Sequence, residues 1–433
     1  MPLYKSFSKH TLGLLAVAAS QLISFSALAA QTDSERIADL EKKLEKSMAL
    51  IEQLSTRLGQ VEGSKTASPA AADVASQGER LDQLEKTIVQ VSENSAKRND
   101  LGLPLHGFAD VGFAYSSNDP NARQGGFTLG TLDVYLTPQF GDRVKSIIEL
   151  AFEYSDQGEL ATDLERMQFG YTFSDAATVW AGRFHTPYGN WNTALHHGPQ
   201  IQTSVIRPRF IDFEDKGGIL PAHGVGLLVS GNLRGGDGKW QYDAYLANGN
   251  SIKNRVLNFN AVKDDNANKL IGGKLQYEFS GSLDGLTLGV HALSQQVDDS
   301  ALAASTKSKV YGAFAVLDRG NWEGIGEYYS FRNEDLSGIT GSHSSWAGFA
   351  QVGYTFGGVW TPYARLERAV LDQADNYFLG QDSGRSYQRQ ALGLRYNLNA
   401  QSALKFELNH TTDELLAGPQ KTNEARLQFA VRF

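Results

Sequence analysis

Residues 105–116 read LHGFADVGFAYS, and along them large apolar side chains alternate with polar or small ones. Leu105, Ala109, Val111, Phe113 and Tyr115 share one parity, and His106, Asp110, Gly112, Ala114 and Ser116 share the other. Successive side chains of a β-strand point to opposite faces of the sheet. A period of two therefore predicts a strand with one apolar face.

The same alternation recurs in fifteen further segments that continue to the C-terminus. They lie at 128–140, 143–154, 162–173, 177–185, 224–233, 239–247, 269–279, 285–295, 308–318, 321–331, 344–356, 359–369, 386–398, 401–411 and 422–433. A tilted strand of about 10 residues is long enough to cross a bilayer. The sequence therefore predicts an all-β fold, a 16-stranded antiparallel transmembrane β-barrel over residues 104–433.

The connections between these segments alternate in length. Every second one is a tight turn, at 141–142, 174–176, 234–238, 281–284, 320, 357–358 and 399–400, whereas the others run from about nine to forty residues. Short turns at one end and longer loops at the other are typical of a membrane barrel. Closure also gives each backbone N–H and C=O an internal partner in hydrocarbon. A large soluble β protein, the alternative, has no reason to sort its loops in this way.

Aromatic residues mark the ends of the predicted strands. Strands that run toward the short turns end in Phe140, Phe173, Phe279, Phe356 and Phe433, and strands that leave them begin with Trp180, Trp240, Trp322 and Trp360. Aromatic side chains are enriched at the two interfaces of a bilayer. Their placement supports the transmembrane interpretation.

The composition excludes several other classes of protein. The 433 residues contain no Cys, which excludes disulfides, thiolate zinc sites and iron–sulfur clusters. The mean hydropathy is −0.33, and beyond the first thirty positions no apolar stretch reaches the roughly 18 residues of a membrane helix. A formal charge of −8 and the lack of a basic stripe disfavour nucleic-acid binding.

Residues 1–29 have the features of a secretory signal peptide. Lys5 and Lys9 precede an apolar stretch, and the run ALA at 27–29 provides a small-residue cleavage site. A membrane anchor is the alternative, but the polar pair at 20–21 interrupts the apolar stretch and favours export.

A coiled coil is predicted within residues 30–62. Its apolar seam has spacings of three and four and includes Ile37, Leu40, Leu44, Ile51, Leu54 and Leu58. Such a seam predicts self-association, and Met48 and Leu50 widen its apolar face, which favours three strands over two. An amphipathic helix packed on its own domain is the alternative. Residues 63–103 follow as a linker and a second short helix.

The signal peptide, the sixteen segments and the terminal strand LQFAVRF at 427–433 resemble a Gram-negative outer-membrane porin. In that family, the barrel-assembly machinery reads a C-terminal Phe on an alternating strand, and Phe433 matches it. The order of stalk and barrel is similar to that of trimeric porins with an N-terminal coiled coil, including phosphate-selective and dicarboxylate-type groups. The resemblance implies a homotrimer in contact with lipid in the cell outer membrane, with its stalk in the periplasm.

The longest connection, at 186–223, follows the fifth predicted strand. In porins this connection folds into the lumen and narrows it, so the resemblance makes 186–223 a candidate constriction loop. Apolar residues such as Trp191 and Phe210 are expected to pin it to the barrel wall. The alternative is a solvated extracellular loop with unremarkable charges.

Opposed charges occur in and beside this loop. The candidates for contact with solutes are Arg183, His185, Arg207, Arg209, Asp212, Glu214 and Lys216. Opposed charges across a narrow passage would produce a transverse field that orients dipolar solutes and screens them by charge.

The inward parity of the predicted strands carries nine basic and ten acidic residues, so the lumen is expected to be balanced in charge. The basic positions are Lys145, Arg166, Arg183, Lys274, Arg365, Arg395, Lys405, Arg426 and Arg432, and the acidic ones are Asp110, Asp133, Glu149, Glu153, Asp243, Glu278, Glu327, Glu367, Glu407 and Glu424. For most of these residues the expected role is that of paired wall charges.

Histidines at 185, 196, 197 and 223 raise the question of a metal site. Adjacent histidines on an extended chain point to opposite sides, and no carboxylate–histidine spacing accompanies them. No metal site and no cofactor are therefore predicted.

Three hypotheses follow from the sequence. The first is a passive diffusion channel for small hydrophilic solutes, with anions and carboxylates among the candidates. The second is a structural outer-membrane protein that ties the envelope together through its stalk. The third is an outer-membrane hydrolase, for which the sequence offers no nucleophile elbow or other recognisable catalytic arrangement. A sixteen-stranded barrel is too wide for wall side chains alone to fill, which favours the channel.

Overall fold

The structure, a computed structural model, describes residues 105–118, 125–154, 158–213, 216–258 and 268–433. Sixteen long strands dominate these residues: β1 (Leu105–Ser116), β2 (Gly125–Leu136), β4 (Val144–Tyr154), β5 (Leu160–Ser174), β6 (Ala177–His185), β7 (His223–Gly235), β8 (Gly238–Asn248), β11 (Lys269–Phe279), β12 (Leu286–Asp299), β13 (Ala304–Arg319), β14 (Trp322–Asp335), β15 (Ser342–Tyr354), β16 (Trp360–Val370), β17 (Tyr387–Asn399), β18 (Ser402–Leu415) and β19 (Gly418–Arg432).

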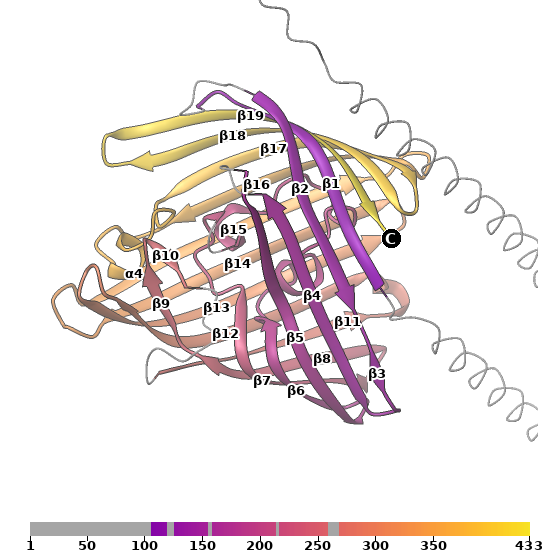
Figure 1. The fold of residues 1–433 in the computed structure, drawn as a ribbon, viewed down its shortest axis with the longest axis horizontal. Coiled ribbons are helices and arrows are strands. Elements are labelled where there is room, and N and C mark those ends of the chain that lie inside the picture. Colours follow the sequence, from indigo (N-terminus) through magenta and orange to yellow (C-terminus); the bar gives the residue numbers. More distant parts are fainter. Residues whose placement is uncertain (1–104, 119–124, 155–157, 214–215, 259–267) are drawn as a thin grey trace, which may run out of the picture. The chain divides into compact units, whose positions relative to one another are not determined.

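The long strands form one closed antiparallel sheet (Figure 1). Each pairs with the strands before and after it, and β1 pairs with both β2 and β19, from Phe108 opposite Arg432 to Ser116 opposite Glu424. Closure gives every long strand a paired neighbour on both sides, which removes the free edges of an open sheet. The predicted 16-stranded antiparallel barrel is confirmed.

Shorter elements lie in the connections. They are β3 (Gln139–Phe140), β9 (Asn250–Lys253), β10 (Val256–Leu257), the helical turns α3 (Trp191–Ala194) and α4 (Asn376–Leu379), and the 3-10 turns η2 (Arg209–Ile211) and η4 (Gly281–Leu283). β3 follows β2 in the chain and pairs with the same neighbouring strand, β4. β9 and β10 form a small hairpin within the connection from β8 to β11. β9 also pairs in parallel with the end of β12, from Asn250 opposite Val297 to Ile252 opposite Asp299.

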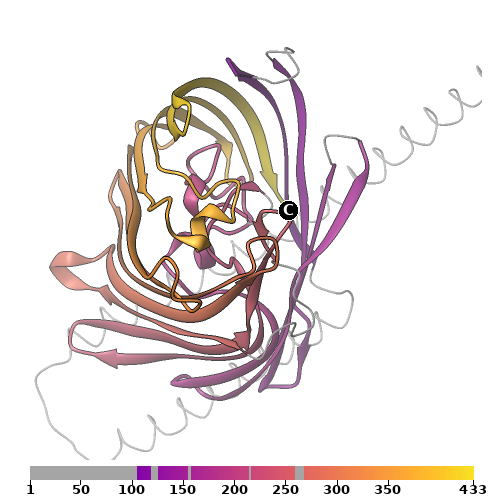
Figure 2. The same ribbon diagram turned by 90° about the vertical axis from the view of Figure 1, so that its left-hand side faces the viewer.

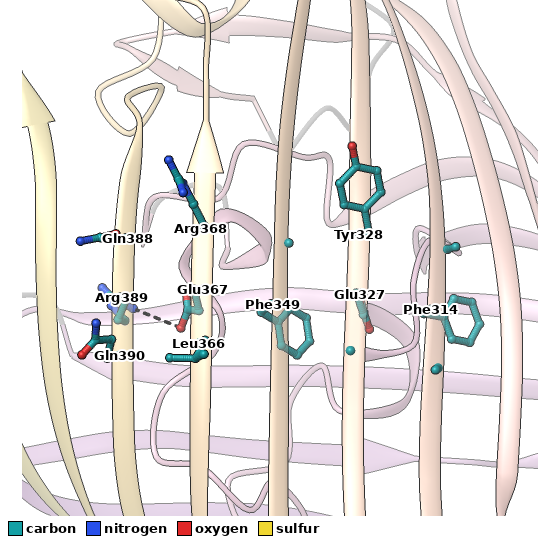
Figure 3. A pocket seen from close by; sticks show the side chains of 14 residues that line it. Phe314, Glu327, Tyr328, Phe349, Leu366, Glu367, Arg368, Gln388, Arg389 and Gln390 are labelled. Carbon is teal, nitrogen blue, oxygen red and sulfur yellow. Dashed lines mark ion pairs between the residues drawn. The ribbon is translucent and has the colours of Figure 1, made fainter.

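Adjacent positions of the wall face opposite sides, as the period of two predicts. Tyr328 and Leu366 are exposed on the outer face, whereas their neighbours Glu327 and Glu367 are buried. Figure 3 shows these residues around a shallow hollow of about 740 Å³ that extends across β13 to β17.

Most of the aromatic residues predicted at the strand ends are exposed, namely Phe140, Phe173, Phe356, Phe433, Trp240, Trp322 and Trp360. Phe279 is half-buried. Trp180 differs from the expectation, since its Nε1 donates to Ser230 Oγ at 3.0 Å and its partly buried side chain packs against the buried apolar residues of the barrel interior.

The expected lengths of the longer connections are partly wrong. Residues 300–303 alone join β12 to β13, and residues 416–417 alone join β18 to β19. The reason is that these strand pairs continue their ladders without interruption, as far as Asp299 opposite Ala304 and Leu415 opposite Gly418. Residues that the sequence pattern assigned to loops are thus part of the paired strands.

The predicted signal peptide (1–29), coiled coil (30–62) and linker with second helix (63–103) lie outside the described residues and stay predictions. Among the described residues, no helix is both long enough and apolar enough to cross a membrane.

Candidate functional site

The connection from β6 to β7 lies inside the barrel. Figure 2 shows this segment, coloured magenta, within the ring of strands. Its hydrogen bonds reach strands far away in the sequence, among them β14, β16 and β18. We refer to residues 186–222 as the inward loop.

One side of the inward loop packs on the wall through apolar contacts. Trp191, Phe210 and Ile211 are each at most 1% exposed. The ring of Trp191 meets that of Phe349 edge to face at 5.6 Å, and the ring of Phe210 meets that of Tyr329 at 5.2 Å. Such edge-to-face pairs add about 0.5–1.5 kcal/mol to the burial of the rings. This packing is what the apolar residues of the loop predicted.

Wall carboxylates bind backbone N–H groups of the inward loop. Glu327 accepts from the N–H groups of Asn190 and Trp191 at 2.8 and 2.7 Å. Glu407 accepts from Val205 at 2.9 Å, and Glu367 accepts from Arg209 N–H, also at 2.9 Å. A loop inside a barrel cannot pair its backbone with a neighbouring strand, so side chains must supply the partners.

Basic wall residues donate hydrogen bonds to the carbonyl groups of the inward loop. Arg365 Nη1 donates to Ile206 O at 2.8 Å. Arg395 Nη1 donates to Gln202 O at 2.8 Å, and Lys405 Nζ donates to Ser204 O at 3.1 Å. Hydrogen bonds from charged groups are stronger than neutral ones. Several charges of the balanced inward set therefore anchor the loop.

The opposite side of the inward loop borders a polar cavity of about 520 Å³. The wall side of this cavity comes from β1, β2, β17, β18 and β19. Its charged lining consists of five basic residues and five acidic ones, namely Arg207, Arg209, Lys216, Arg389 and Arg426 against Asp110, Asp133, Asp212, Asp413 and Glu424. The cavity is therefore mixed in sign.

The structure brings together four of the seven residues predicted for solute contact. Arg207, Arg209, Asp212 and Lys216 line the cavity. Arg183 and His185 are buried and are not among its described lining residues. Glu214 lies outside the described residues.

Arg207 and Arg209 differ in what they contact. Arg207 is 6% exposed and donates to His196 O at 3.1 Å and to Ile211 O at 2.7 Å, so it mainly holds the loop together. Arg209 pairs with Asp413 of β18 and lies 4.6 Å above the ring of Tyr387. It joins the loop to the far wall of the cavity.

The side chains of Asp212 and Lys216 are more exposed than that of Arg207, although most of the Asp212 side chain is still buried. The Asp212 side chain is 24% exposed and lies 3.9 Å from Arg207 Nε. Burial raises the pKa of the Asp212 carboxyl, against the opposing effect of Arg207. Lys216 is 42% exposed and pairs with Glu153 of β4.

Arg389 and Asp413 also line the cavity and were not predicted, although the sequence carries a signal for both. Arg389 has the parity of Arg395 on β17, and Asp413 has the parity of Glu407 on β18. Asp413 was missed because the predicted strand stopped at 411, whereas β18 continues to Leu415.

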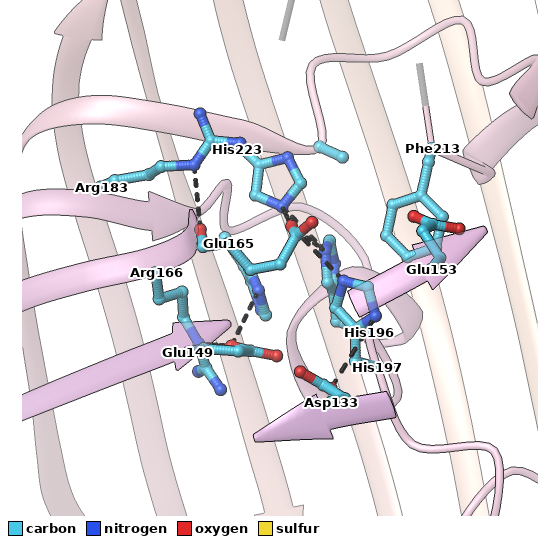
Figure 4. Close-up of polar contacts among 12 residues, drawn as sticks. Asp133, Glu149, Glu153, Glu165, Arg166, Arg183, His196, His197, Phe213 and His223 are labelled. Atoms are coloured by element: carbon cyan, nitrogen blue, oxygen red, sulfur yellow. Dashed lines mark hydrogen bonds and ion pairs between the residues drawn. The ribbon is translucent and has the colours of Figure 1, made fainter. Parts of the chain in front are cut away.

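A second cluster of polar side chains lies where β5, β6 and β7 meet the inward loop (Figure 4). Glu165, His185, His196 and His223 are all buried, and one ligand-type atom from each lies within 4.8 Å of the others. Burial lowers the pKa of His196 well below its ordinary value of 6.5, and the neighbouring His185 lowers it further.

One of the two reasons given from the sequence against a metal site, the extended chain at the adjacent histidines, is wrong. Residues 195–197 form a bend, so the chain there is not extended. His196 Nε2 and His197 Nε2 lie 4.0 and 3.4 Å from the same Glu165 oxygen.

Searches with the sequence match no protein-family model and no curated protein. The fold, by contrast, matches solved structures. The anion-selective porin from Comamonas acidovorans aligns with a TM-score of 0.55 at 15% identity, over 77% of this chain and 99% of that one. The chain has the fold of an outer-membrane porin.

Two further structures share this porin fold. The outer membrane channel DcaP of Acinetobacter baumannii aligns with a TM-score of 0.51 at 13% identity, over 76% of this chain and 97% of its own. The trimer form of OmpT, an outer membrane protein of Vibrio cholerae, aligns with a TM-score of 0.50 at 10% identity, over 77% of this chain and 99% of its own.

Proposed function

We propose that the protein is an outer-membrane diffusion channel for small hydrophilic solutes, and that the inward loop sets its width. The observation that carries the proposal is the polar cavity between the loop and the wall. Oppositely charged side chains line it, whereas the other side of the loop packs on the wall through apolar contacts. We therefore expect the aqueous path to run beside the loop, along β1, β2 and β17 to β19.

Passage through such a channel needs no energy source or cofactor. A solute exchanges water for the polar groups of the lining, and the balance of charges there decides which ions pass more readily. Arg209, Arg389 and Arg426 would bind anionic groups, and Asp110, Asp413 and Glu424 would bind cationic ones. This mixture favours zwitterionic or dipolar solutes over a strict preference for either sign.

We propose that the protein is a homotrimer with a periplasmic coiled coil. The heptad seam of residues 30–62 and the trimer form of the structurally similar OmpT support this assembly. Phe433 fits the role of assembly signal read by the barrel-assembly machinery, because it is exposed at the end of the closing strand.

Planar-bilayer recordings test the channel directly. The purified trimer should insert with conductance steps in groups of three, and liposomes that contain it should swell in solutions of small sugars or amino acids. The absence of both signals from folded protein would refute the proposal. Deletion of residues 31–100 should leave the flux per barrel unchanged, whereas loss of envelope attachment alone would favour the tether hypothesis.

A further inference from the structure

Four potential metal ligands meet from four separate segments of the chain. His185 ends β6 and His223 begins β7, and the two residues are directly opposite each other in the β6–β7 ladder. His196 comes from the inward loop, and Glu165 comes from β5. All four side chains are buried, at 3–6% exposure. We refer to them as the histidine cluster.

A β-bulge aims Glu165 at the histidines. In the β4–β5 ladder, Arg166 lies opposite Glu149 and Leu164 lies opposite Leu150, so Glu165 has no opposite residue. A bulge inserts one extra residue and turns its side chain away from the regular alternation. The Glu165 carboxylate consequently lies 2.6 Å from His223 Nε2.

The separations between the ligand atoms are close to those of a metal site. Zinc binds histidine nitrogen at about 2.0–2.1 Å and carboxylate oxygen at about 2.0–2.2 Å, so neighbouring ligand atoms of a tetrahedral site lie about 3.3 Å apart. Here His196 Nε2 lies 3.0 Å from His223 Nε2 and 4.0 Å from the Glu165 oxygen. Shifts of less than about 1 Å bring these three atoms into that range.

The fourth ligand, His185, must rotate its ring to direct a nitrogen at the metal position. The ring of His185 stacks on that of His196 with centroids 3.5 Å apart. Neither ring nitrogen of His185 makes a hydrogen bond among the described residues, although Nε2 lies 3.4 Å from a Glu149 oxygen. Tilting the His185 ring toward the cluster therefore breaks no hydrogen bond.

A further residue orients His196. Its Nδ1 lies 3.0 Å from Asn192 O and 2.9 Å from Asn192 Oδ1. The Asn192 amide is itself fixed, because its Nδ2 donates to Thr186 O and Ala222 O. An Nδ1–H that donates to Asn192 leaves the Nε2 lone pair directed into the cluster, which is how metal-binding histidines are usually oriented.

We infer that Glu165, His185, His196 and His223 bind a divalent transition-metal ion, and that this ion fastens the inward loop to the barrel wall. Three imidazoles and one carboxylate suit zinc. Four protein ligands close the coordination sphere, which is typical of a structural site. Because three ligands belong to the wall and His196 to the loop, the ion would join the two. This inference does not depend on channel activity.

The test uses full-length trimer in detergent, without a histidine tag, stripped with a chelator and then titrated with ZnCl₂ in a calorimeter. We expect one zinc ion per chain. The variants H196Q, H185Q and E165Q should each lose about 100-fold or more in affinity, since even an outer partner of a metal ligand contributes about 10–100-fold. H343Q is the matched control, because His343 is also buried beside a carboxylate, that of Asp372.

Cobalt(II) provides an independent readout. Bound to the intact cluster, it should give the visible absorption of a four-coordinate ion, and zinc should displace it. The electrophoretic mobility of unheated samples shows whether each variant is folded. Folded wild-type protein that binds no stoichiometric zinc would overturn the inference, as would folded H196Q and H185Q that bind it unchanged. In either case the cluster would be a hydrogen-bonded group only.

Discussion

Gly107 and Phe433 exchange two backbone hydrogen bonds, each 3.0 Å long, at the seam where the last strand closes the barrel on the first. The Phe433 ring occupies the space beside Gly107, since a Cβ atom there would lie 2.4 Å from Phe433 Cζ. The residue expected to act as the assembly signal is therefore also part of the final strand pairing.

We expect Gly107→Val to weaken barrel closure. The added side chain must displace the Phe433 ring and the nearby Asp133 carbonyl, and overpacking of this kind costs about 1–3 kcal/mol. The variant should lose its compact gel mobility at a lower temperature than wild type. Gly126→Val is the control, because nothing lies within 4 Å of a Cβ at Gly126. Equal melting of both variants would contradict this account of the seam.

Glu327→Ala should loosen the inward loop. It removes the acceptor of two loop N–H groups, and each buried group left without a partner costs about 1–3 kcal/mol. Single-channel recordings should show larger or noisier conductance, and a protease should cut the loop more readily. Glu334→Ala, an exposed position of the same strand, should behave like wild type. An unchanged loop in folded Glu327→Ala would show that this carboxylate is dispensable.

Arg426 and Glu424 should set charge preference in opposite directions. Both line the cavity, and the Arg426 side chain is 34% exposed. Arg426→Glu should shift the reversal potential in a KCl gradient toward cations, and Glu424→Gln should shift it toward anions. Lys421→Glu changes an exposed residue of β19 that does not line the cavity, so it should cause no shift. Arg207 is a poorer choice for this experiment, because its guanidinium holds loop carbonyl groups.

Selectivity should depend on pH through Asp212. Burial raises the pKa of this carboxyl from its ordinary value of 3.8, so it gains a proton at a higher pH than an exposed aspartate. Protonation removes one negative charge from the cavity, and anion preference should rise as the pH falls. Asp212→Asn should remove this part of the pH response. If Asp212→Asn keeps the full wild-type response, other carboxyls are responsible.

Substitutions in the predicted heptad seam should weaken the proposed trimer. Replacing Leu44 and Ile51 with Asp places charges in the predicted apolar seam, where a coiled coil requires apolar side chains. Native mass spectrometry or crosslinking should then show fewer trimers. Substitution of Lys42 and Lys46, which lie on the side of the predicted helix away from the seam, serves as the control. Trimers that persist undiminished would show that the barrels alone hold the assembly together.

The strand pattern was predictable because it is local. A period of two places Glu327, Glu367 and Glu407 on the inner face, and the structure has them there. Their role was not predictable, since the backbone groups that they bind lie about 136–202 positions away in the chain.

The histidine cluster was not predicted because the backbone departs from its regular pattern at two places. A bulge interrupts the alternation at Glu165, and a bend turns His196 and His197 toward the same carboxylate.

The anchors of the inward loop also bear on the order of folding. Lys405 donates to the Pro199 carbonyl, which precedes it by 206 positions, and Glu407 lies on the same late strand. During synthesis the loop is complete long before these partners exist, and contacts between distant parts of a chain form slowly. The loop can therefore reach its final position only when the last hairpins arrive, so a truncated or stalled barrel would keep this segment exposed to proteases that clear misfolded chains.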